Sequence, residues 1–343
     1  MIKKIGILTF HEGLNHGSFF QALGLKNIVS SLGHNVEIIN YKNKHHYLNE
    51  LKAYFYTKNP LNFYRGLKKL YSFKVAQRKM YLDKLFHDIK SASYFDAIII
   101  GSDTVWNYSD PFLGHDPSYF GHGLKAGKLI SYAASFGSSG PIDAIPNYVR
   151  DGLNNFNYIS VRDLISAKKV MEITGQSPEI VLDPTLLFNW SEHEADIDQE
   201  EFVLVYAYSF REEEIVEIRS FAAKKNLKII SIGYYNHWSD INLVEVDPFS
   251  WLTYFKKASY VFTSTFHGAL FSVIYEKKFF VSFNQYIYDK TLWVLDSFGI
   301  DTNKISKISD IENEIDYKKI NSNINSKRIK SLEYLQNSIS SLK

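Results

Sequence analysis

The chain contains no cysteine among its 343 residues. This absence excludes disulfides, thiolate catalysis, and zinc or iron–sulfur sites held by cysteine. No apolar run approaches the roughly 20 residues that a membrane-spanning helix requires. A large charge of one sign is also missing, because 39 basic residues balance 37 acidic ones and leave a net charge of +2. The composition therefore gives no reason to expect a nucleic acid as partner.

A secretory leader is not expected at the N-terminus. Lys3 and Lys4 precede a short apolar run that ends before His11, which is too short for a signal-peptide core with its cleavage site. The run is more typical of the first strand of a sheet. We expect a cytoplasmic protein, with attachment to the inner face of the membrane as an alternative.

Short apolar segments rich in β-branched residues alternate with helical patterns in both halves of the chain. Such strands are typical of parallel sheets buried on both faces, so the pattern predicts an α/β protein with two Rossmann-like domains facing a cleft. The expected strands are 4–10, 35–40, 97–101, 129–133, 158–161, 202–208, 227–232, 260–263 and 279–283. The expected helices are 18–31, pieces of 48–90, 144–154, 164–174, 212–225, 249–257, 266–276 and 289–298.

The two halves suggest domain boundaries. We expect an N-terminal Rossmann-like domain at 1–190 on the acceptor side and a second at 191–317 on the donor side. Residues 318–343 are predicted to form a C-terminal helix, which we expect to cross back to the first domain.

The segment Tyr260 to Glu276 carries the strongest local signal. A buried strand leads through Ser264 and Thr265 into a helix, and His267 lies at the junction beside Gly268. Free N–H groups at a helix start after a strand bind anions in α/β proteins, and a histidine there can exchange protons near neutral pH. A capping or core histidine is the alternative.

Two similar junctions occur in the first half. Gly101 to Asn107 follows a strand: Gly101 permits a sharp turn, Ser102 and Asp103 can cap a following helix, and Trp106 offers a flat face to a sugar. A purely structural turn is the alternative.

Asn15 to Gln21 places polar side chains and a glycine at another helix start. It lacks the G-x-G-x-x-G spacing, which disfavours a nicotinamide enzyme, and Gly121 to Lys128 does not match a P-loop.

Arg162 ends a further strand, and its guanidinium can donate two parallel hydrogen bonds to a carboxylate or phosphate. The alternative is a local ion pair with Asp163 or another acid. Pro184 forces Asp183 out of helical geometry, so we interpret Asp183 as architectural. His45-His46 and His115/Asp116 lack a third ligand, so we expect solvated loop histidines and no metal site.

Residues 65–90 are basic, with aromatic and aliphatic residues interleaved. One interpretation is a surface helix with an apolar seam. The other is a patch that contacts an anionic membrane surface or a lipid-linked substrate.

Several segments occur together and in order, and as a set the chain resembles the polysaccharide pyruvyltransferase family over about residues 3–300. They are Asn15-x-Gly17-x-x-x-Gln21, Gly101-Ser102-Asp103-x-x-Trp106-Asn107, Ile130 to Gly137, Val161-Arg162-Asp163, Asp183 to Leu187, and Ser264-x-Phe266-His267-Gly268. The resemblance implies a GT-B-like fold and transfer of pyruvate from phosphoenolpyruvate to a sugar of a cell-surface glycan precursor, such as capsule or exopolysaccharide. It implies no metal and no organic cofactor; the acceptor is either lipid-linked or a polymer.

The residues and the resemblance together give the predicted site. The catalytic candidates are His267 and Arg162. The predicted substrate-binding residues are Asn15, Gly17, Gln21, Gly101, Ser102, Asp103, Trp106, Asn107, Ser264, Thr265, Phe266, Gly268 and Lys290.

Two departures from the family pattern bear on the donor. Many members carry arginine where this chain has Thr265, and Lys290 stands near a position that is often arginine. A lysine supplies a point charge without the bidentate fork of arginine. Two other functions stay open: a sugar-nucleotide glycosyltransferase with the GT-B fold, and an inactive glycan-binding relative.

Overall fold

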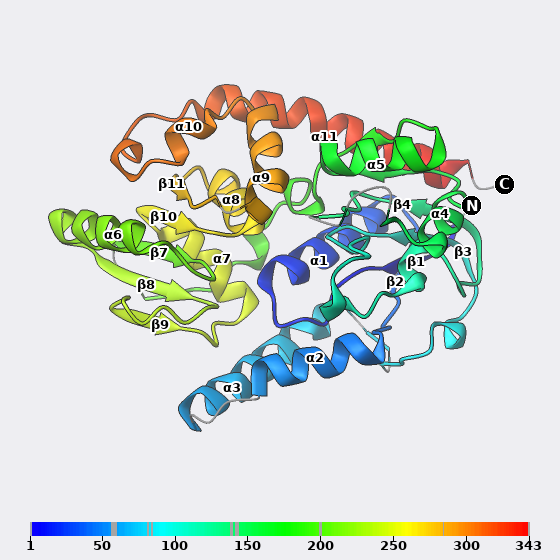
Figure 1. The fold of residues 1–343 in the computed structure, drawn as a ribbon, viewed down its shortest axis with the longest axis horizontal. Coiled ribbons are helices and arrows are strands. Elements are labelled where there is room, and N and C mark those ends of the chain that lie inside the picture. Colours follow the sequence, from blue (N-terminus) through cyan, green and yellow to red (C-terminus); the bar gives the residue numbers. More distant parts are fainter. Residues whose placement is uncertain are drawn as a thin grey trace.

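Two separate parallel β-sheets organise the chain into two lobes (Figure 1). The computed structural model describes residues 2–55, 60–80, 82–83, 85–137, 140, 144–198, 201–283 and 285–341; for Tyr54 and residues 285–290 it describes the backbone only. The first lobe is built on the sheet β2-β1-β3-β4 and the second on β11-β10-β7-β8-β9. This arrangement confirms the predicted α/β class with two Rossmann-like domains.

The strands of both sheets are short; the central ones, β1, β3, β7 and β10, are mostly buried because helices cover both faces, whereas β9 and much of β4 are only half-buried. In the first sheet they are β1 (Lys4–Leu8), β2 (Asn35–Ile38), β3 (Phe95–Ile100) and β4 (Ala126–Ser131). In the second they are β7 (Phe202–Tyr206), β8 (Lys228–Ile232), β9 (Ile241–Leu243), β10 (Tyr260–Thr263) and β11 (Lys278–Val281). A small pair, β5 (Ser160–Val161) and β6 (Glu179–Ile180), adjoins β4 through the bridge Ile130 to Tyr158.

Helices connect the strands and fill the layers around each sheet. They are α1 (His16–Ser31), α2 (Lys44–Phe55), α3 (Pro60–Gln77), α4 (Asn147–Leu153), α5 (Leu164–Thr174), α6 (Glu212–Lys225), α7 (Pro248–Lys257), α8 (Phe266–Ile274), α9 (Gln285–Ser297), α10 (Thr302–Ile305) and α11 (Tyr317–Ser340). The predicted helical pieces of 48–90 correspond to α2 and α3; beyond them, the described residues of this range form 3-10 turns at 78–80 and 89–91. No helix in the described ranges combines the length and apolarity needed to cross a bilayer.

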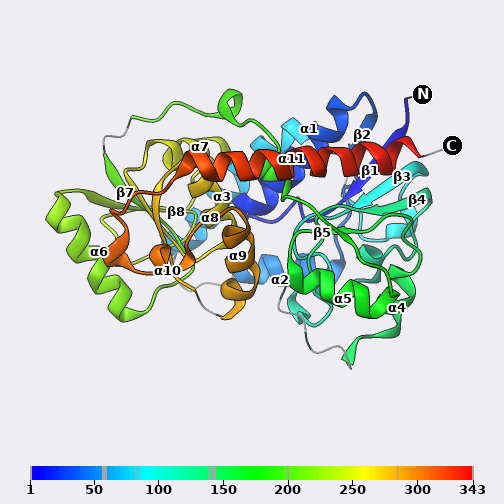
Figure 2. The same ribbon diagram turned by 90° about the horizontal axis from the view of Figure 1, so that it is seen from above.

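The last helix returns to the first lobe, as predicted. Figure 2 shows α11 running across both lobes and ending near the N-terminus. The Tyr334 hydroxyl donates to the Ser131 carbonyl at 2.9 Å, and Lys128 Nζ donates to the Ser341 carbonyl at 2.9 Å. These contacts fasten the end of the chain to β4. The boundaries at 190 and 317 stay predictions.

One hydrophobic core continues from lobe to lobe through α1. Phe20 on α1 stacks on Trp251 of α7 with ring centroids 5.6 Å apart, and Phe19 meets Phe249 edge-on at 5.8 Å. Because the lobes share this core, the residues between them are held in fixed positions.

A buried lysine joins α3 to the second lobe and makes stability depend on pH. Lys69 Nζ donates to the Gly233 carbonyl at 2.8 Å, and burial lowers the pKa of Lys69 to about 7. In the unfolded chain the pKa of lysine is about 10.4, so between pH 7 and 10 the unfolded state binds more protons and stability rises with pH. We expect the free energy of unfolding to rise from pH 7 to 9.5 by about 3 kcal/mol more in wild type than in Lys69→Met. Urea titrations at both pH values measure this difference, and parallel pH dependences would contradict it.

Candidate active site

A cavity of about 440 Å³ opens between the lobes at the carboxyl ends of the strands. From the first lobe it is lined by Thr9 after β1, by Asp103 after β3 and by the start of α1; from the second it is lined by the start of α8. This edge of parallel sheets is where α/β proteins bind ligands.

The first turns of α1 and α8 meet at this cavity. Asn15 caps α1 by accepting from the Ser18 N–H at 3.2 Å, and Thr265 caps α8 by accepting from the Gly268 N–H at 3.0 Å. A Cβ added to Gly17 would lie 2.1 Å from Nδ1 of His267, so α1 and the imidazole are in close contact. Two helix N-termini, each with a partial positive charge, therefore converge on one space.

Four ionisable side chains form a cluster beside these helix starts. Arg162 binds Asp183 through NH1 at 2.7 Å and Asp103 through NH2 at 3.1 Å, and its guanidinium stacks on the Phe266 ring at 4.4 Å. His267 Nε2 lies 3.7 Å from Oδ2 of Asp183. The cluster therefore links the end of β5, the loop after β3 and the start of α8.

The cluster keeps both carboxylates ionised. Burial alone would raise the pKa of Asp183, but His267, Arg162 and the hydroxyl of Thr185 together lower it below its usual range. The pKa of Asp103 is also lowered, because Arg162 and His267 outweigh the effect of burial. The pKa of Arg162 is raised by the two carboxylates in spite of its burial. A fixed negative charge at Asp183 therefore faces the imidazole.

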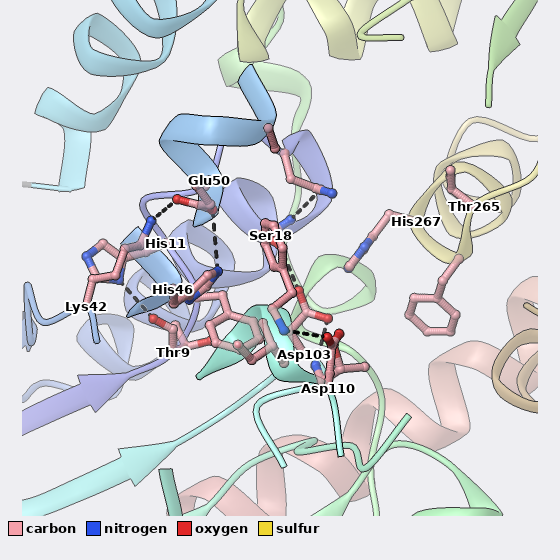
Figure 3. Close-up of a pocket in the computed structure, with 18 of the residues that line it drawn as sticks. Thr9, His11, Ser18, Lys42, His46, Glu50, Asp103, Asp110, Thr265 and His267 are labelled. Atoms are coloured by element: carbon pink, nitrogen blue, oxygen red, sulfur yellow. Dashed lines mark hydrogen bonds and ion pairs between the residues drawn. The ribbon is translucent and has the colours of Figure 1, made fainter. Parts of the chain in front are cut away.

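His267 reaches from α8 into the cavity toward Ser18 and Asp103, as Figure 3 shows. Its side chain is 10% exposed; its Nε2 is buried, lies toward Asp183 and makes no hydrogen bond within the described part of the chain. An imidazole that lines a cavity beside a carboxylate is suited to proton transfer.

The family model for polysaccharide pyruvyl transferase matches residues 15–284, most of the chain. The chain belongs to this family. It is therefore a transferase of polysaccharide biosynthesis with a glycan acceptor. A comparison with curated proteins gives no match.

Solved structures with low sequence identity share the fold. A UDP-N-acetylglucosamine 2-epimerase matches at a TM-score of 0.52 and 10% identity, over 94% of this chain and 90% of that one. A protein from Listeria monocytogenes assigned as a UDP-N-acetylglucosamine 2-epimerase matches at a TM-score of 0.51 and 8% identity, over 98% of this chain and 91% of that one. These similarities establish the two-lobed GT-B-type fold of the transferase and nothing about its substrates.

The transferase brings together predicted residues from four separate segments. Those that line the cavity are Asn15, Asp103, Arg162, Thr265, Phe266 and His267. Ser264 supports the junction by accepting from the Tyr208 N–H at 3.1 Å. Gly268 lies behind it, where an added Cβ would stand 2.0 Å from the Thr263 hydroxyl, so only glycine fits.

Other predicted substrate-binding residues hold the loops behind the cavity. Gln21 is fully buried and donates to the Phe10 carbonyl at 2.7 Å, while the Ser102 hydroxyl donates to Gln21 at 2.7 Å. Gly101 has a φ of 106°, and a Cβ there would lie 2.5 Å from the Tyr132 carbonyl, which confirms the sharp turn. The expectation that these residues touch substrate is wrong for Gln21 and Ser102, because their polar atoms are bonded inside the first lobe.

The predicted substrate contacts of Trp106 and Asn107 also require correction. Trp106 is fully buried, and its indole N–H donates to the Tyr119 carbonyl at 2.8 Å, so it presents no face to a sugar. Asn107 is buried and accepts from the Ser109 hydroxyl at 3.1 Å. Both residues shape the loop that carries Asp103.

The predicted roles of Arg162 and of the residues after β3 change as well. The alternative of an ion pair is confirmed for Arg162, but its partners are the buried Asp103 and Asp183 and not Asp163 or a surface acid; Asp163 caps α5. Two carboxylates already neutralise the guanidinium, which disfavours Arg162 as the main anchor of an anionic donor. Asp103 caps no helix, since a turn follows it and its carboxylate binds Arg162 and the Ser18 hydroxyl.

Sequence reasoning missed two parts of the site. Asp183 was interpreted as architectural, and it does cap the turn at Pro184–Leu186, but it also contacts both His267 and Arg162. His46 was expected to be a solvated loop residue, yet it lies buried on α2 and lines the cavity, and burial together with Lys42 lowers its pKa to about 3. Local pattern gives no signal for either contact.

Two further points concern ligands. The side chain of Lys290 lies outside the described residues, so its role stays a prediction. Within the described ranges, no group of three or more histidine or acidic side chains is placed to hold a metal ion.

The close contact between α1 and the imidazole of His267 can be tested by substituting Gly17. Gly17→Ala places a methyl group where Nδ1 of His267 now lies, so the ring must move. We expect activity to fall about 100-fold, because displacements near 1 Å have that effect on catalysis. Stability should fall by about 1–3 kcal/mol, because the new Cβ also lies within 2.8 Å of Cβ of His267 and overpacks the contact. Steady-state kinetics and urea unfolding measure both, with Ser30→Ala at the exposed end of α1 as control. Unchanged activity in Gly17→Ala would contradict the placement of His267.

Proposed function

We propose that this transferase moves the pyruvyl group of phosphoenolpyruvate onto a sugar of a glycan precursor, forms a pyruvate ketal across two hydroxyls, and releases phosphate. The observation that carries the proposal is the position of His267: its imidazole faces the cavity, beside the ionised Asp183, where α1 and α8 begin. Membership in the family supports the reaction class.

The donor carries a carboxylate and a phosphate, so its site needs several N–H donors or cations. The N-termini of α1 and α8 supply N–H groups and partial positive charge at one place. Arg162 acts mainly by holding Asp103 and Asp183 in position, and Lys290 is proposed as an additional cation on the donor side.

The chemistry requires one group that both gives and takes protons. Protonation of the donor CH₂ by His267 leaves an oxocarbenium-like centre at C2, which the first sugar hydroxyl attacks while its proton passes to the imidazole. The C2–O bond to phosphate then breaks as the imidazolium gives its proton to the leaving phosphate. The second hydroxyl attacks C2 and closes the ketal, and its proton passes to the imidazole, which restores the starting imidazolium. General acid–base catalysis of this kind contributes about 10²–10⁴-fold. The Asp183 carboxylate, 3.7 Å from Nε2, holds the ring in place beside the cavity.

We place the acceptor in the first-lobe arm of the cavity. This arm is lined by Phe10, Lys42, His46 and Glu50. Lys42 and His46 both contact the Glu50 carboxylate, and this polar network on an aromatic wall is suited to sugar hydroxyls. Figure 3 shows this group across the cavity from His267.

The test is an assay with phosphoenolpyruvate and a panel of lipid-linked and aryl glycosides. We expect phosphate release and a product heavier than the acceptor by pyruvate less water, measured by mass spectrometry. A sugar-nucleotide glycosyltransferase would instead be stabilised by UDP- or GDP-sugars and not by phosphoenolpyruvate in a thermal-shift assay. An inactive relative would bind glycan and release no phosphate. Either result would overturn the proposal.

A further inference from the structure

The outer face of α3 is unusually apolar for a surface helix. Tyr64, Leu67, Tyr71 and Val75 recur at helical spacing on this face, and their exposed fractions are 55%, 44%, 72% and 40%. Phe73 is fully buried on the opposite side and packs into the shared core. The helix therefore has a core-facing side and a second apolar ridge that faces away from the protein.

Positive charge flanks this ridge. Residues 60–80 contain six lysines and arginines and no aspartate or glutamate. Lys68, Lys74 and Arg78 lie on the exposed side; Lys79 is exposed as well, but its Nζ lies 4.1 Å from the centroid of the Phe249 ring. Of these, Lys74 has one distant partner, Glu12 at 3.8 Å, and remains 58% exposed. An apolar ridge between cationic side chains is the pattern of helices that lie in the interface of anionic bilayers.

The ridge is held rigidly and close to the cavity. Lys69 binds the Gly233 carbonyl, and Arg65 stacks on Tyr235 at 5.4 Å, so α3 is fixed to the second lobe. The neighbouring α2 contributes Glu50 and Ala53 to the cavity wall. In Figure 1, α2 and α3 form the lower edge of the molecule, on the side opposite α11.

We propose that the exposed face of α3 docks on the surface of an anionic lipid bilayer. The ridge enters the boundary between headgroups and acyl chains, while the lysines and Arg78 meet lipid phosphates. We choose an anionic bilayer as the partner because residues 60–80 are basic and contain no acidic residue. Anionic headgroups are therefore attracted to this segment and meet no like charge on it. The consequence for the proposed reaction is that the cavity beside α2 comes close to a lipid-linked acceptor; the docking itself does not depend on that reaction.

Vesicle co-sedimentation tests the docking directly. The full chain is mixed with vesicles of phosphatidylcholine alone or with 30% phosphatidylglycerol, at low salt and in about 0.5 M NaCl. We expect binding to the anionic vesicles, little to the neutral ones, and loss of binding at high salt. Lys68→Gln and Arg78→Gln should each weaken partitioning about fivefold, and Leu67→Ser/Tyr71→Ser should weaken it further.

A matched control lies on α6 of the second lobe. Val216 is 66% exposed there, and Val216→Ser/Arg219→Gln removes one apolar and one basic group from a different face. This variant should bind like wild type, and circular dichroism confirms that every variant is folded. Failure of wild type to bind anionic vesicles would overturn the proposal, as would equal losses in the α3 and α6 variants. Tight binding to RNA or to a protein partner without vesicle binding would also overturn it. Pyruvyl transfer to a free aryl glycoside does not require docking, so its failure is a separate result.

Discussion

His267→Ala is expected to lower turnover about 10²–10⁴-fold while the protein stays folded, because the imidazole supplies the general acid and base of the proposed reaction. The side chain begins at the first turn of α8, whose cap is made by Thr265 and not by the histidine. The variant loses the electrostatic contact between His267 Nε2 and Asp183 at 3.7 Å, but no hydrogen bond within the described part of the chain.

The measurement is a phosphate-release rate with the acceptor found by mass spectrometry, accompanied by thermal unfolding. Asp183 keeps Arg162 and the Thr185 hydroxyl as partners in the variant, so the melting temperature should change by only a few degrees. His34→Ala is the matched control, because His34 lies in the first lobe away from this cavity. Near-native turnover in a folded His267→Ala protein would exclude the imidazole from the chemistry.

Arg162→Ala is expected to destabilise the protein by about 3–5 kcal/mol at pH 7, because it leaves buried carboxylates without their cation. The side chains of Arg162, Asp103 and Asp183 are only 3%, 12% and 1% exposed. The carboxylates would therefore lose their cation while remaining largely buried.

The stability lost in Arg162→Ala should be smaller at low pH than at pH 7. In wild type the pKa values of Asp103 and Asp183 are below those of the unfolded chain, so their ionised forms stabilise the fold above about pH 4, and this contribution is lost as the pH falls. Removing Arg162 removes much of that contribution, so the difference between wild type and variant should shrink from pH 7 toward pH 4. Urea unfolding at several pH values measures it, and Arg219→Ala, on an exposed position of α6, should stay within about 0.5 kcal/mol. A stable Arg162→Ala protein with a raised KM for phosphoenolpyruvate would instead restore Arg162 as a donor anchor.

Local sequence signals predicted the parts of the site that depend on neighbours along the chain. The sequence predicts helix starts within 15–21 and after Thr265, but not their caps, which Asn15 and Thr265 make to residues three positions later. Gly101 was expected at a sharp turn and has a positive φ. The helix starts and this turn are each satisfied within a few residues, so the sequence alone determines them.

Errors arose where a residue's surroundings come from distant segments. A tryptophan can stack on a sugar ring, but Trp106 is buried because it packs against Phe120 and Phe136. The strands β6 and β9 were missed because each has only two or three residues, too few for a recognisable pattern. Their existence depends on pairing with β5 and β8.

The sequence by itself determined the parallel α/β class, the order of the motifs and the junction at His267, because hydrophobic period and helix capping act over a few residues. Only the tertiary structure decided that Asp183 faces that histidine and that Arg162 is neutralised by Asp103, 59 residues away, and Asp183, 21 residues away. Charges have no fixed partner along a chain. Their partners follow from which strand ends the fold brings to the same edge.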